Sequence, residues 1–232
     1  DGVLRLAGGE FLDHETEPFI DLTLTATDAE GVETSSVVRI TVTNVAEAPT
    51  VPQIDNDQVV ENLPGAVIGT VSVEQDPDGA GVTFTVDDAR FEIVGGVLKL
   101  RDGVSLDYET EPQVSLVITG RAANGIEVSS DITLQVTNEN EAPTAPVLSN
   151  TTVPEDAQVI GTVTASDPDA GDTLTFTVDD PRFEIVDGVL RLAGGEFLDH
   201  ETEPFIDLTL TATDAEGVET SSVVRITVTN VA

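Results

Sequence analysis

The chain has 232 residues, of which 44 are Asp or Glu and 9 are Lys or Arg, so its formal charge is −35 at neutral pH. This charge excludes nucleic-acid binding, and no apolar run is long enough for direct membrane insertion. Hydrophobic residues make up 39%, too many for a solvated acidic tail, and the absence of Cys excludes disulfides and thiolate metal sites.

The chain begins with a segment that recurs at its end. Residues 1–46 are identical to residues 187–232, at an offset of 186 residues. A diverged copy lies between them, since "RFEIVGGVLKL" at 90–100 matches "RFEIVDGVLRL" at 182–192. The unit is therefore about 92–94 residues long, and identity over 46 residues indicates a recent duplication within a long tandem array. We divide the chain into residues 1–49, 50–142 and 143–232.

Residues 1–49 correspond only to the C-terminal half of a unit, because residue 1 matches residue 187. The counterparts of about 145–186 are missing, so this half should not fold alone. We expect it to form strands that superpose on the end of the last unit. An upstream stretch or a neighbouring chain would then supply the first half.

Residues 50–142 and 143–232 are complete units in which every periodic segment has the strand pattern. Thr, Val, Ile and Leu alternate through "VIGTVTAS", "DLTLTATD" and "VVRITVTN", as in half-buried strands, and "DPDAGD", "DDP" and "DAEG" interrupt them. Seven short strands per unit predict an all-β protein of tandem immunoglobulin-like β-sandwiches. In the last unit we expect strands near 150–154, 159–166, 173–178, 182–186, 189–193, 205–213 and 221–229.

Acidic motifs recur at fixed places in these units. "LDHETEP" at 12–18 returns as "LDYETEP" at 106–112 and unchanged at 198–204. Successive loops of a sandwich alternate between its two ends, so the loops after the first and fifth strands lie at the downstream end. The loops after the second and sixth strands lie at the upstream end. Stacking units head to tail therefore predicts that carboxylates meet at each junction: Glu61, Asp107, Glu109 and Glu141 facing Asp167, Asp169 and Asp214.

Clustered carboxylates indicate a cation. Two like charges in contact cost on the order of 1 kcal/mol even in water. Carboxylate, amide and carbonyl oxygens suit Ca²⁺, which accepts six to eight oxygens in flexible geometry, better than Zn²⁺ or Cu²⁺. A single "DPD" loop is more often a solvated turn, whereas a set that recurs at matching ends favours calcium.

The motifs of the last unit resemble a cadherin repeat in order and spacing: "VPED", "TASDPDAG", "FEIVDGVLRL", "LDHE", "LTATDAEG" and "ITVTN". The middle unit is similar through "VEN", "EQDPDG", "LDYE" and "TNENEAP", and the linker and Cys-free acidic composition resemble cadherin-like repeats of large bacterial surface proteins. The resemblance implies calcium ligands at the second junction: Glu61, Asp107, Glu109, Asn138, Asn140, Glu141, Asp167, Asp169 and Asp214, with Glu139 a candidate through its carbonyl. The corresponding residues elsewhere are Asp13, Glu15, Asn44, Glu47, Asp76 and Asp78 at the first junction, and Glu155, Asp199, Glu201 and Asn230 after the last unit.

The first junction is expected to be the weaker one. Ala122 replaces the counterpart of Asp214, and Ala46 replaces the counterpart of Asn140. In the family pattern both missing groups serve the calcium ion nearest the downstream unit. We therefore expect about one ion fewer at this junction, with strong and weak junctions alternating along an array of 186-residue repeats.

Other sites are less well supported by the sequence. His14 and His200 occupy the position of Tyr108, which favours a packing or surface role over metal binding. Asp107 and Glu109 could be a glycosidase pair, yet the same pair recurs in each repeat, and an array of identical active sites is improbable. We therefore expect no enzyme.

The expected function is a calcium-stiffened extracellular stalk or fibre segment of a long bacterial adhesin. Its partners would be neighbouring repeats of the same chain, other copies side by side, and exopolysaccharide. One alternative is a calcium-dependent, lectin-like module, although Tyr108 and a few Phe are the only stacking platforms. Another is halophilic adaptation without a specific metal, which scarce Lys favours and clustered carboxylates oppose.

Overall fold

The computed structural model describes residues 2–79 and 81–231, and within them all regular structure is β. No helix in these ranges has the length and apolar character needed to cross a bilayer. The predicted all-β class is therefore confirmed. The chain divides into two compact units, Asp1–Thr137 and Asn138–Ala232. The finer division at residues 49 and 142 stays a prediction.

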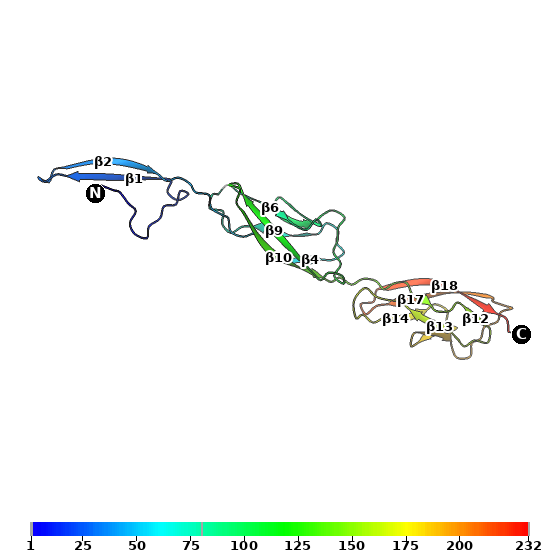
Figure 1. Ribbon diagram of the computed structural model, residues 1–232. Helices are drawn as coiled ribbons and strands as arrows, with labels where there is room; N and C mark the ends of the chain where they lie inside the picture. The colour runs from blue at the N-terminus through cyan, green and yellow to red at the C-terminus, as the bar shows by residue number, and fades with distance from the viewer. Residues whose placement is uncertain (1, 80, 232) are drawn as a thin grey trace. The chain divides into compact units, whose positions relative to one another are not determined.

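The first unit begins with a single hairpin. After a loop that ends at residue 18, β1 (Phe19–Thr27) and β2 (Glu33–Thr41) pair antiparallel, with Phe19 opposite Thr41 (Figure 1). The identical sequence in the second unit pairs in the same register, with Phe205 opposite Thr227. Two of the strands expected in the first half-repeat are thus confirmed, whereas residues 3–6 do not form the strand that their equivalents 189–192 form. We call the paired strands the first hairpin.

The rest of the first unit, which we call the middle repeat, is a sandwich of two four-stranded sheets. One sheet has the order β4-β10-β9-β6 and the other β3-β5-β8-β7 (Figure 1). Its strands are β3 (Gln53–Ile54), β4 (Gln58–Val60), β5 (Val67–Ser72), β6 (Val82–Val86), β7 (Phe91–Val94), β8 (Val97–Leu100), β9 (Gln113–Ala122) and β10 (Glu127–Thr137).

The second unit, which we call the last repeat, has the same arrangement. Its sheets have the orders β12-β18-β17-β14 and β11-β13-β16-β15. Its strands are β11 (Val147–Leu148), β12 (Thr152–Pro154), β13 (Val159–Thr164), β14 (Thr175–Val178), β15 (Phe183–Val186), β16 (Val189–Leu192), β17 (Phe205–Thr213) and β18 (Glu219–Thr229).

Alternating side chains form each core, because successive residues of a strand point to opposite faces. Along β17 the inward residues Ile206, Leu208, Leu210 and Ala212 are at most 3% exposed, while the intervening residues are partly or fully solvated. Buried side chains from both sheets form one continuous cluster in the last repeat and a matching cluster in the middle repeat. The cores hold the loops at each end of the sandwich in fixed positions.

The first strand of each repeat corrects one expectation. The strand expected near 150–154 is β12, which begins at Thr152, but a separate strand, β11, precedes it and was not expected. β11 pairs antiparallel with β13, and β12 pairs parallel with β18, so the chain changes sheets between them. Asn150 occupies the bend between them, where its Nδ2 donates to the Ile160 carbonyl. Polar side chains at the bend satisfy backbone groups that a continuous strand would have paired within one sheet.

Candidate metal centres

The downstream end of the middle repeat gathers three carboxylates. One oxygen each of Glu61, Asp107 and Glu109 lies within 4.8 Å of the others. Glu61 is only 2% exposed, and its Oε2 accepts a hydrogen bond from the Tyr108 amide at 2.7 Å. The β4 end and the loop before β9 supply these side chains, so the predicted convergence of loops that are distant in sequence is confirmed within this repeat.

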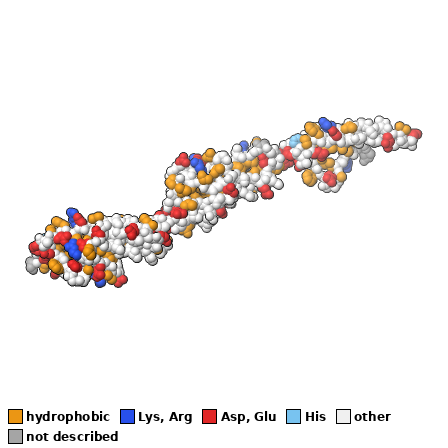
Figure 2. Space-filling model, turned by 180° about the vertical axis from the view of Figure 1, so that it is seen from behind, with side chains coloured by type: hydrophobic (Ala, Val, Ile, Leu, Met, Phe, Trp, Pro, Cys, Tyr) orange, Lys and Arg blue, Asp and Glu red, His pale blue; other side chains and the backbone are white. Residues whose placement is uncertain are grey.

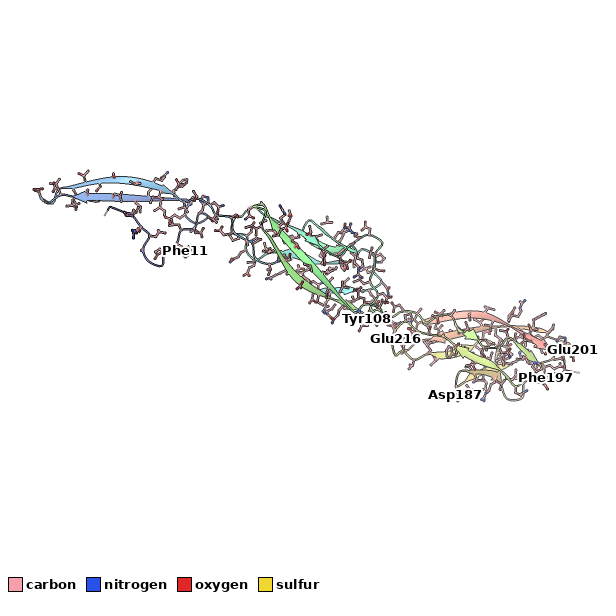
Figure 3. All side chains as sticks on the ribbon, viewed as in Figure 1. Phe11, Tyr108, Asp187, Phe197, Glu201 and Glu216 are labelled. Atoms are coloured by element: carbon pink, nitrogen blue, oxygen red, sulfur yellow. The ribbon has the colours of Figure 1, made fainter. Side chains whose placement is uncertain are left out.

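The same end of the last repeat repeats the arrangement. Glu155, Asp199 and Glu201 bring carboxylate oxygens within 4.8 Å of one another. Glu155 accepts hydrogen bonds from the amides of His200 and Val231, and these bonds hold its pKa below the ordinary value. Figure 3 shows Glu201 at the end of this unit that carries the C-terminus, with Glu216 at the opposite end.

Asn230 follows β18 and contacts this group. Its Nδ2 donates to Glu201 Oε1 at 2.5 Å. Asp199 also orders its own turn, since its Oδ2 accepts the Thr202 hydroxyl. The four residues expected at this end of the last repeat are therefore neighbours.

The upstream end of the last repeat binds the linker that precedes it. The Asn138 side-chain amide donates to Asp169 Oδ1 at 2.8 Å, and the Glu141 backbone amide donates to Asp169 Oδ2 at 2.8 Å. The Asn140 side-chain amide donates to Asp214 Oδ2 at 2.8 Å. Three linker residues that were predicted as ligands thus contact two of the predicted carboxylates, those of Asp169 and Asp214. Glu139 is exposed in the same linker.

One further carboxylate at this end, that of Asp172, was not predicted. Asp167, Asp172 and Asp214 have oxygens within 4.8 Å of one another, and Asp214 is 6% exposed. Asp172 ends the "DPDAGD" stretch, of which only Asp167 and Asp169 were predicted as ligands. Three acidic residues within one six-residue loop were the signal that could have identified it. Asp167 Oδ2 is buried without a hydrogen-bond partner.

The upstream end of the middle repeat receives its linker in the same way. The Asn44 side-chain amide and the Glu47 backbone amide donate to Asp78 at 3.2 and 3.3 Å. Carboxylate oxygens of Glu15, Glu47 and Asp78 lie within 4.8 Å of one another. Asp13, by contrast, uses its carboxylate to order the turn that contains Thr16.

Among the described residues, this end has no group of three carboxylates like the one that contains Asp167 in the last repeat. The turn after β9 has the hydrogen bonds of the turn after β17, which places Ala122 where the last repeat has Asp214. Asn124, which was not predicted, donates its amide to Asp78 and, at 2.8 Å, to the Glu47 carbonyl. The counterpart of Asp167 is Asp76, whose Oδ1 is likewise buried without a hydrogen-bond partner.

The two histidines have the same structural role. His14 Nδ1 lies 2.8 Å from the Val42 carbonyl, and His200 Nδ1 lies 2.7 Å from the Val228 carbonyl. Each contact ties the acidic loop to the end of the neighbouring strand. This supports the expected packing role, in which the imidazole donates to a backbone carbonyl.

The electrostatics at both upstream ends are unfavourable. Partial desolvation and the carboxylates of Glu15 and Asp78 raise the pKa of Glu47 above its ordinary value. Desolvation, Asp172 and Asp214 raise the pKa of Glu216 in the same sense. Figure 2 shows acidic side chains spread over the visible face, with few basic ones among them. A bound cation would relieve this repulsion.

Calcium fits the donor set. The three-carboxylate groups, the linker amides and the neighbouring backbone carbonyls offer oxygen ligands, and the buried oxygens of Asp76 and Asp167 lack a protein donor. Ca²⁺ accepts this mixture of carboxylate, amide and carbonyl oxygens in irregular geometry, whereas Zn²⁺ selects nitrogen and sulfur ligands. Bound calcium would supply charge neutralisation, while the hydrogen bonds of the linkers orient the carboxylates.

Comparison with known proteins finds cadherins and protocadherins as relatives. Protocadherin-16 of Mus musculus is 31% identical over 243 residues, which cover 94% of this chain and 7% of the relative. Cadherin-1 of Gallus gallus is 32% identical over 190 residues, covering 69% of this chain and 21% of the relative. The chain therefore spans only a small part of these proteins. No protein-family model matches.

Solved structures show the same fold. Protocadherin Gamma B2 extracellular cadherin domains 1-5 match with a TM-score of 0.62 and 23% identity, over 96% of this chain and 47% of that one. Human Protocadherin-24 EC1-2 matches with a TM-score of 0.61 and 22% identity, over 78% of this chain and 100% of that one. The chain is therefore built of tandem cadherin-like repeats with the fold of extracellular cadherin domains.

Proposed function

We propose that the chain is a calcium-stiffened segment of an extracellular adhesive stalk or fibre and that it has no enzymatic role. The observation that carries this proposal is the group formed by Glu15, Glu47 and Asp78. Its members come from the loop before the first hairpin, from the linker and from the middle repeat. A cation bound by all three would join a repeat, its linker and the following repeat.

By equivalence of sequence, the residues around the second linker would bind calcium in the same way. The proposed ligands divide into three sets: the downstream carboxylates of one repeat, the linker residues, and the upstream carboxylates of the next. They are Glu61, Asp107 and Glu109; Asn138, Glu139, Asn140 and Glu141; and Asp167, Asp169, Asp172 and Asp214. Without calcium, repulsion among carboxylates would leave folded repeats on a flexible linker.

The experiment compares small-angle scattering and thermal melts of the whole chain in EDTA, in millimolar Ca²⁺ and in molar NaCl. We expect Ca²⁺ to raise the melting temperature and to narrow the distribution of scattering dimensions, because it fixes the linkers. NaCl only screens the charges and should reproduce little of either effect. Full replacement of Ca²⁺ by NaCl would support halophilic adaptation in place of calcium binding.

We propose that the chain comes from a large bacterial surface protein, because of two features of its sequence. The identity of residues 1–46 with 187–232 indicates a recently duplicated array, and the acidic, Cys-free composition resembles such surface proteins. In such a fibre, neighbouring repeats and laterally aligned copies would be the partners. Electron microscopy of cells carrying the full-length gene product, labelled with an antibody to this segment, tests the surface location.

Polysaccharide binding is a second candidate because of two exposed aromatic side chains at equivalent positions. Phe11 is 82% exposed on the loop before β1. Phe197 is 72% exposed on the loop between β16 and β17, and its ring could stack on a sugar. Retention of the chain on immobilised exopolysaccharide, and its loss in the double variant Phe11→Ala with Phe197→Ala, would favour this candidate. The matched variant Val223→Ala removes a side chain that is 71% exposed on a strand and should leave retention unchanged.

A further inference from the structure

The turn between β9 and β10 contains an Asn–Gly pair at the upstream end of the middle repeat. Asn124 and Gly125 are both exposed to solvent. Gly125 has a φ of 93°, a conformation that favours glycine, and its equivalent Gly217 has a φ of 90°. The turn therefore requires glycine in both repeats, whereas the residue before it differs: Asn124 in the middle repeat and Glu216 in the last. Asn124 is the only Asn in the sequence that Gly follows.

Hydrogen bonds hold both ends of the Asn124 side-chain amide. Its Oδ1 accepts the Ile126 backbone amide at 2.9 Å. Its Nδ2 donates to the Glu47 carbonyl at 2.8 Å and to Asp78 Oδ2. If the Gly125 nitrogen attacks the side-chain carbonyl carbon, negative charge develops on Oδ1 and positive charge on the nitrogen that leaves. The donor at Oδ1 and the acceptors at Nδ2 would stabilise these charges.

We propose that Asn124 is a modification site, at which the folded chain deamidates and so replaces the amide beside Asp78 with a carboxylate. The Gly125 nitrogen forms a bond to Asn124 Cγ, and its proton passes to hydroxide. The side-chain nitrogen takes a proton from water and leaves as ammonia. Water then opens the resulting cyclic imide at either carbonyl and leaves aspartate or isoaspartate. Because Gly125 has no Cβ, its nitrogen is more accessible than that of any other residue type.

The new carboxylate would change how the linker is held. Before the reaction, the Asn124 amide joins the Glu47 carbonyl to Asp78 without a metal. Afterwards two carboxylates would face each other and repel. The equivalent Glu216 already experiences such an environment, since desolvation and neighbouring carboxylates raise its pKa. This consequence rests on the calcium function proposed above: the modified end would need a cation where the unmodified end uses an amide.

The test for the reaction incubates the whole chain in EDTA at mildly acidic and at mildly alkaline pH. Fragmentation mass spectrometry then locates the mass gain that replaces NH₂ by OH. Asn138 is the internal control, because its amide also donates to a carboxylate, Asp169 Oδ1 at 2.8 Å, but the next residue is Glu139. We expect Asn124 to react at least about tenfold faster than Asn138, and faster at alkaline pH.

Two references decide whether the fold permits the reaction. Asn124→Gln keeps an amide on a longer side chain that closes the ring poorly, so this position should show no mass gain. A peptide of residues 119–130 gives the rate for the unfolded turn. Conversion of Asn124 in the folded chain more than about tenfold slower than in the peptide would overturn the proposal, because the fold would then protect the site. Conversion no faster than at Asn138 would also overturn it.

A second measurement tests the effect on the linker. The Glu47 backbone amide donates to Asp78 at 3.3 Å, so its hydrogen exchange reports this contact. In Asn124→Asp we expect about tenfold faster exchange of this amide in EDTA and recovery in millimolar Ca²⁺. Asn124→Ala removes the same hydrogen bonds without adding charge, so exchange should stay fast in Ca²⁺. Equal recovery in both variants would contradict the role of the new carboxylate.

The two measurements separate this proposal from the calcium function. The mass gain at Asn124 is recorded in EDTA and needs no metal. A chain that deamidates but binds no Ca²⁺ would support the modification site and contradict the proposed calcium function. A chain that binds Ca²⁺ and keeps Asn124 intact would contradict the modification site alone.

Discussion

At the scale of single residues, we expect Asp214 to determine how many calcium ions the last repeat binds. Its carboxylate belongs to the group with Asp167 and Asp172 and also accepts the Asn140 amide. Asp28 is its equivalent in the first hairpin and lies in the same turn, where its Oδ1 accepts the amides of Glu30 and Val32. We expect Asp214→Ala to bind about one Ca²⁺ fewer than the wild-type chain, as measured by calorimetric titration.

Asp28→Ala is the matched control for that substitution because the surrounding sequence is identical. It removes the same charge and should leave the number of bound ions unchanged. If both variants bind fewer Ca²⁺ ions by the same number, binding depends on the total charge of the chain, and the assignment of a site at Asp214 is wrong.

The pH dependence of calcium binding follows from Glu47. Its pKa is raised from the ordinary value of 4.5 by desolvation and by Glu15 and Asp78. In the metal-free protein, the raised pKa means that protonated Glu47 favours the folded state. This contribution to folding stability is fully present below the ordinary pKa and is lost as the pH rises through the raised pKa. Calcium competes with that proton, so affinity at this site should increase from about pH 4 to about pH 7. Calcium titrations at several pH values measure it.

Glu47→Gln supplies the control for this pH effect. The amide keeps the shape of the side chain but has no proton to release, so the difference between variant and wild type should be largest at neutral pH. A difference that stays constant across this range would show that Glu47 does not bind the ion.

At the scale of secondary-structure elements, the strands could be predicted from the sequence and the change of sheet could not. "DLTLTATD" and "VVRITVTN" predicted β17 and β18 because a half-buried strand alternates apolar and polar residues. The bend between β11 and β12 depends on which strands lie on either side, and periodicity carries no information about partners. Asp13, Glu15 and their equivalents could be placed by loop parity, and the acidic loop 167–172 carried a signal for Asp172. Asn124 could not be identified from the sequence, because its contacts with Asp78 and Glu47 depend on the conformation of its turn.

Gly161 makes the change of sheet possible. A Cβ there would lie 2.9 Å from Ser149 Oγ and 3.1 Å from the Asn150 nitrogen, at the bend between β11 and β12. We expect Gly161→Ala to destabilise the last repeat by about 2 kcal/mol. At Gly194 a Cβ would meet no atom within 4 Å, so Gly194→Ala should change stability by less than about 0.5 kcal/mol. Urea unfolding followed by circular dichroism compares them, and equal effects would show that the bend tolerates a side chain.

The same substitution should change the free energy of unfolding by different amounts in the two copies of the repeated sequence. Leu210 is 0% exposed in β17, whereas its equivalent Leu24 in β1 is 45% exposed. Leu210→Ala should lower the free energy of unfolding of the last repeat by about 3 kcal/mol, through lost burial and a residual cavity. Leu24→Ala should lower the stability of the folded repeats by less than about 0.5 kcal/mol. Native-state hydrogen exchange of residues 143–186, whose sequence occurs once, reports the stability of the last repeat. Exchange there should become faster in Leu210→Ala and should stay unchanged in Leu24→Ala.

At the scale of the whole molecule, the chain carries two kinds of upstream end. The last repeat has a group of three carboxylates, Asp167, Asp172 and Asp214, and its linker supplies Asn140. The middle repeat has Ala122 and Ala46 at two of these positions, and the Asn124 amide contacts Asp78 there. An amide hydrogen bond adds no positive charge, so it offsets carboxylate repulsion less than a divalent cation does.

We therefore expect strong and weak calcium junctions to alternate in an array of 186-residue repeats. Introducing Ala122→Asp together with Ala46→Asn should add about one Ca²⁺ per chain in calorimetric titration, because it restores two oxygen ligands beside Asp76. It should also reduce the conformational spread seen by small-angle scattering in Ca²⁺ and leave the spread in EDTA unchanged. Ala123→Asp is the charge-matched control, since this neighbouring residue is exposed on the same turn. An unchanged stoichiometry in the double variant, or an equal gain in the control, would contradict alternating junctions.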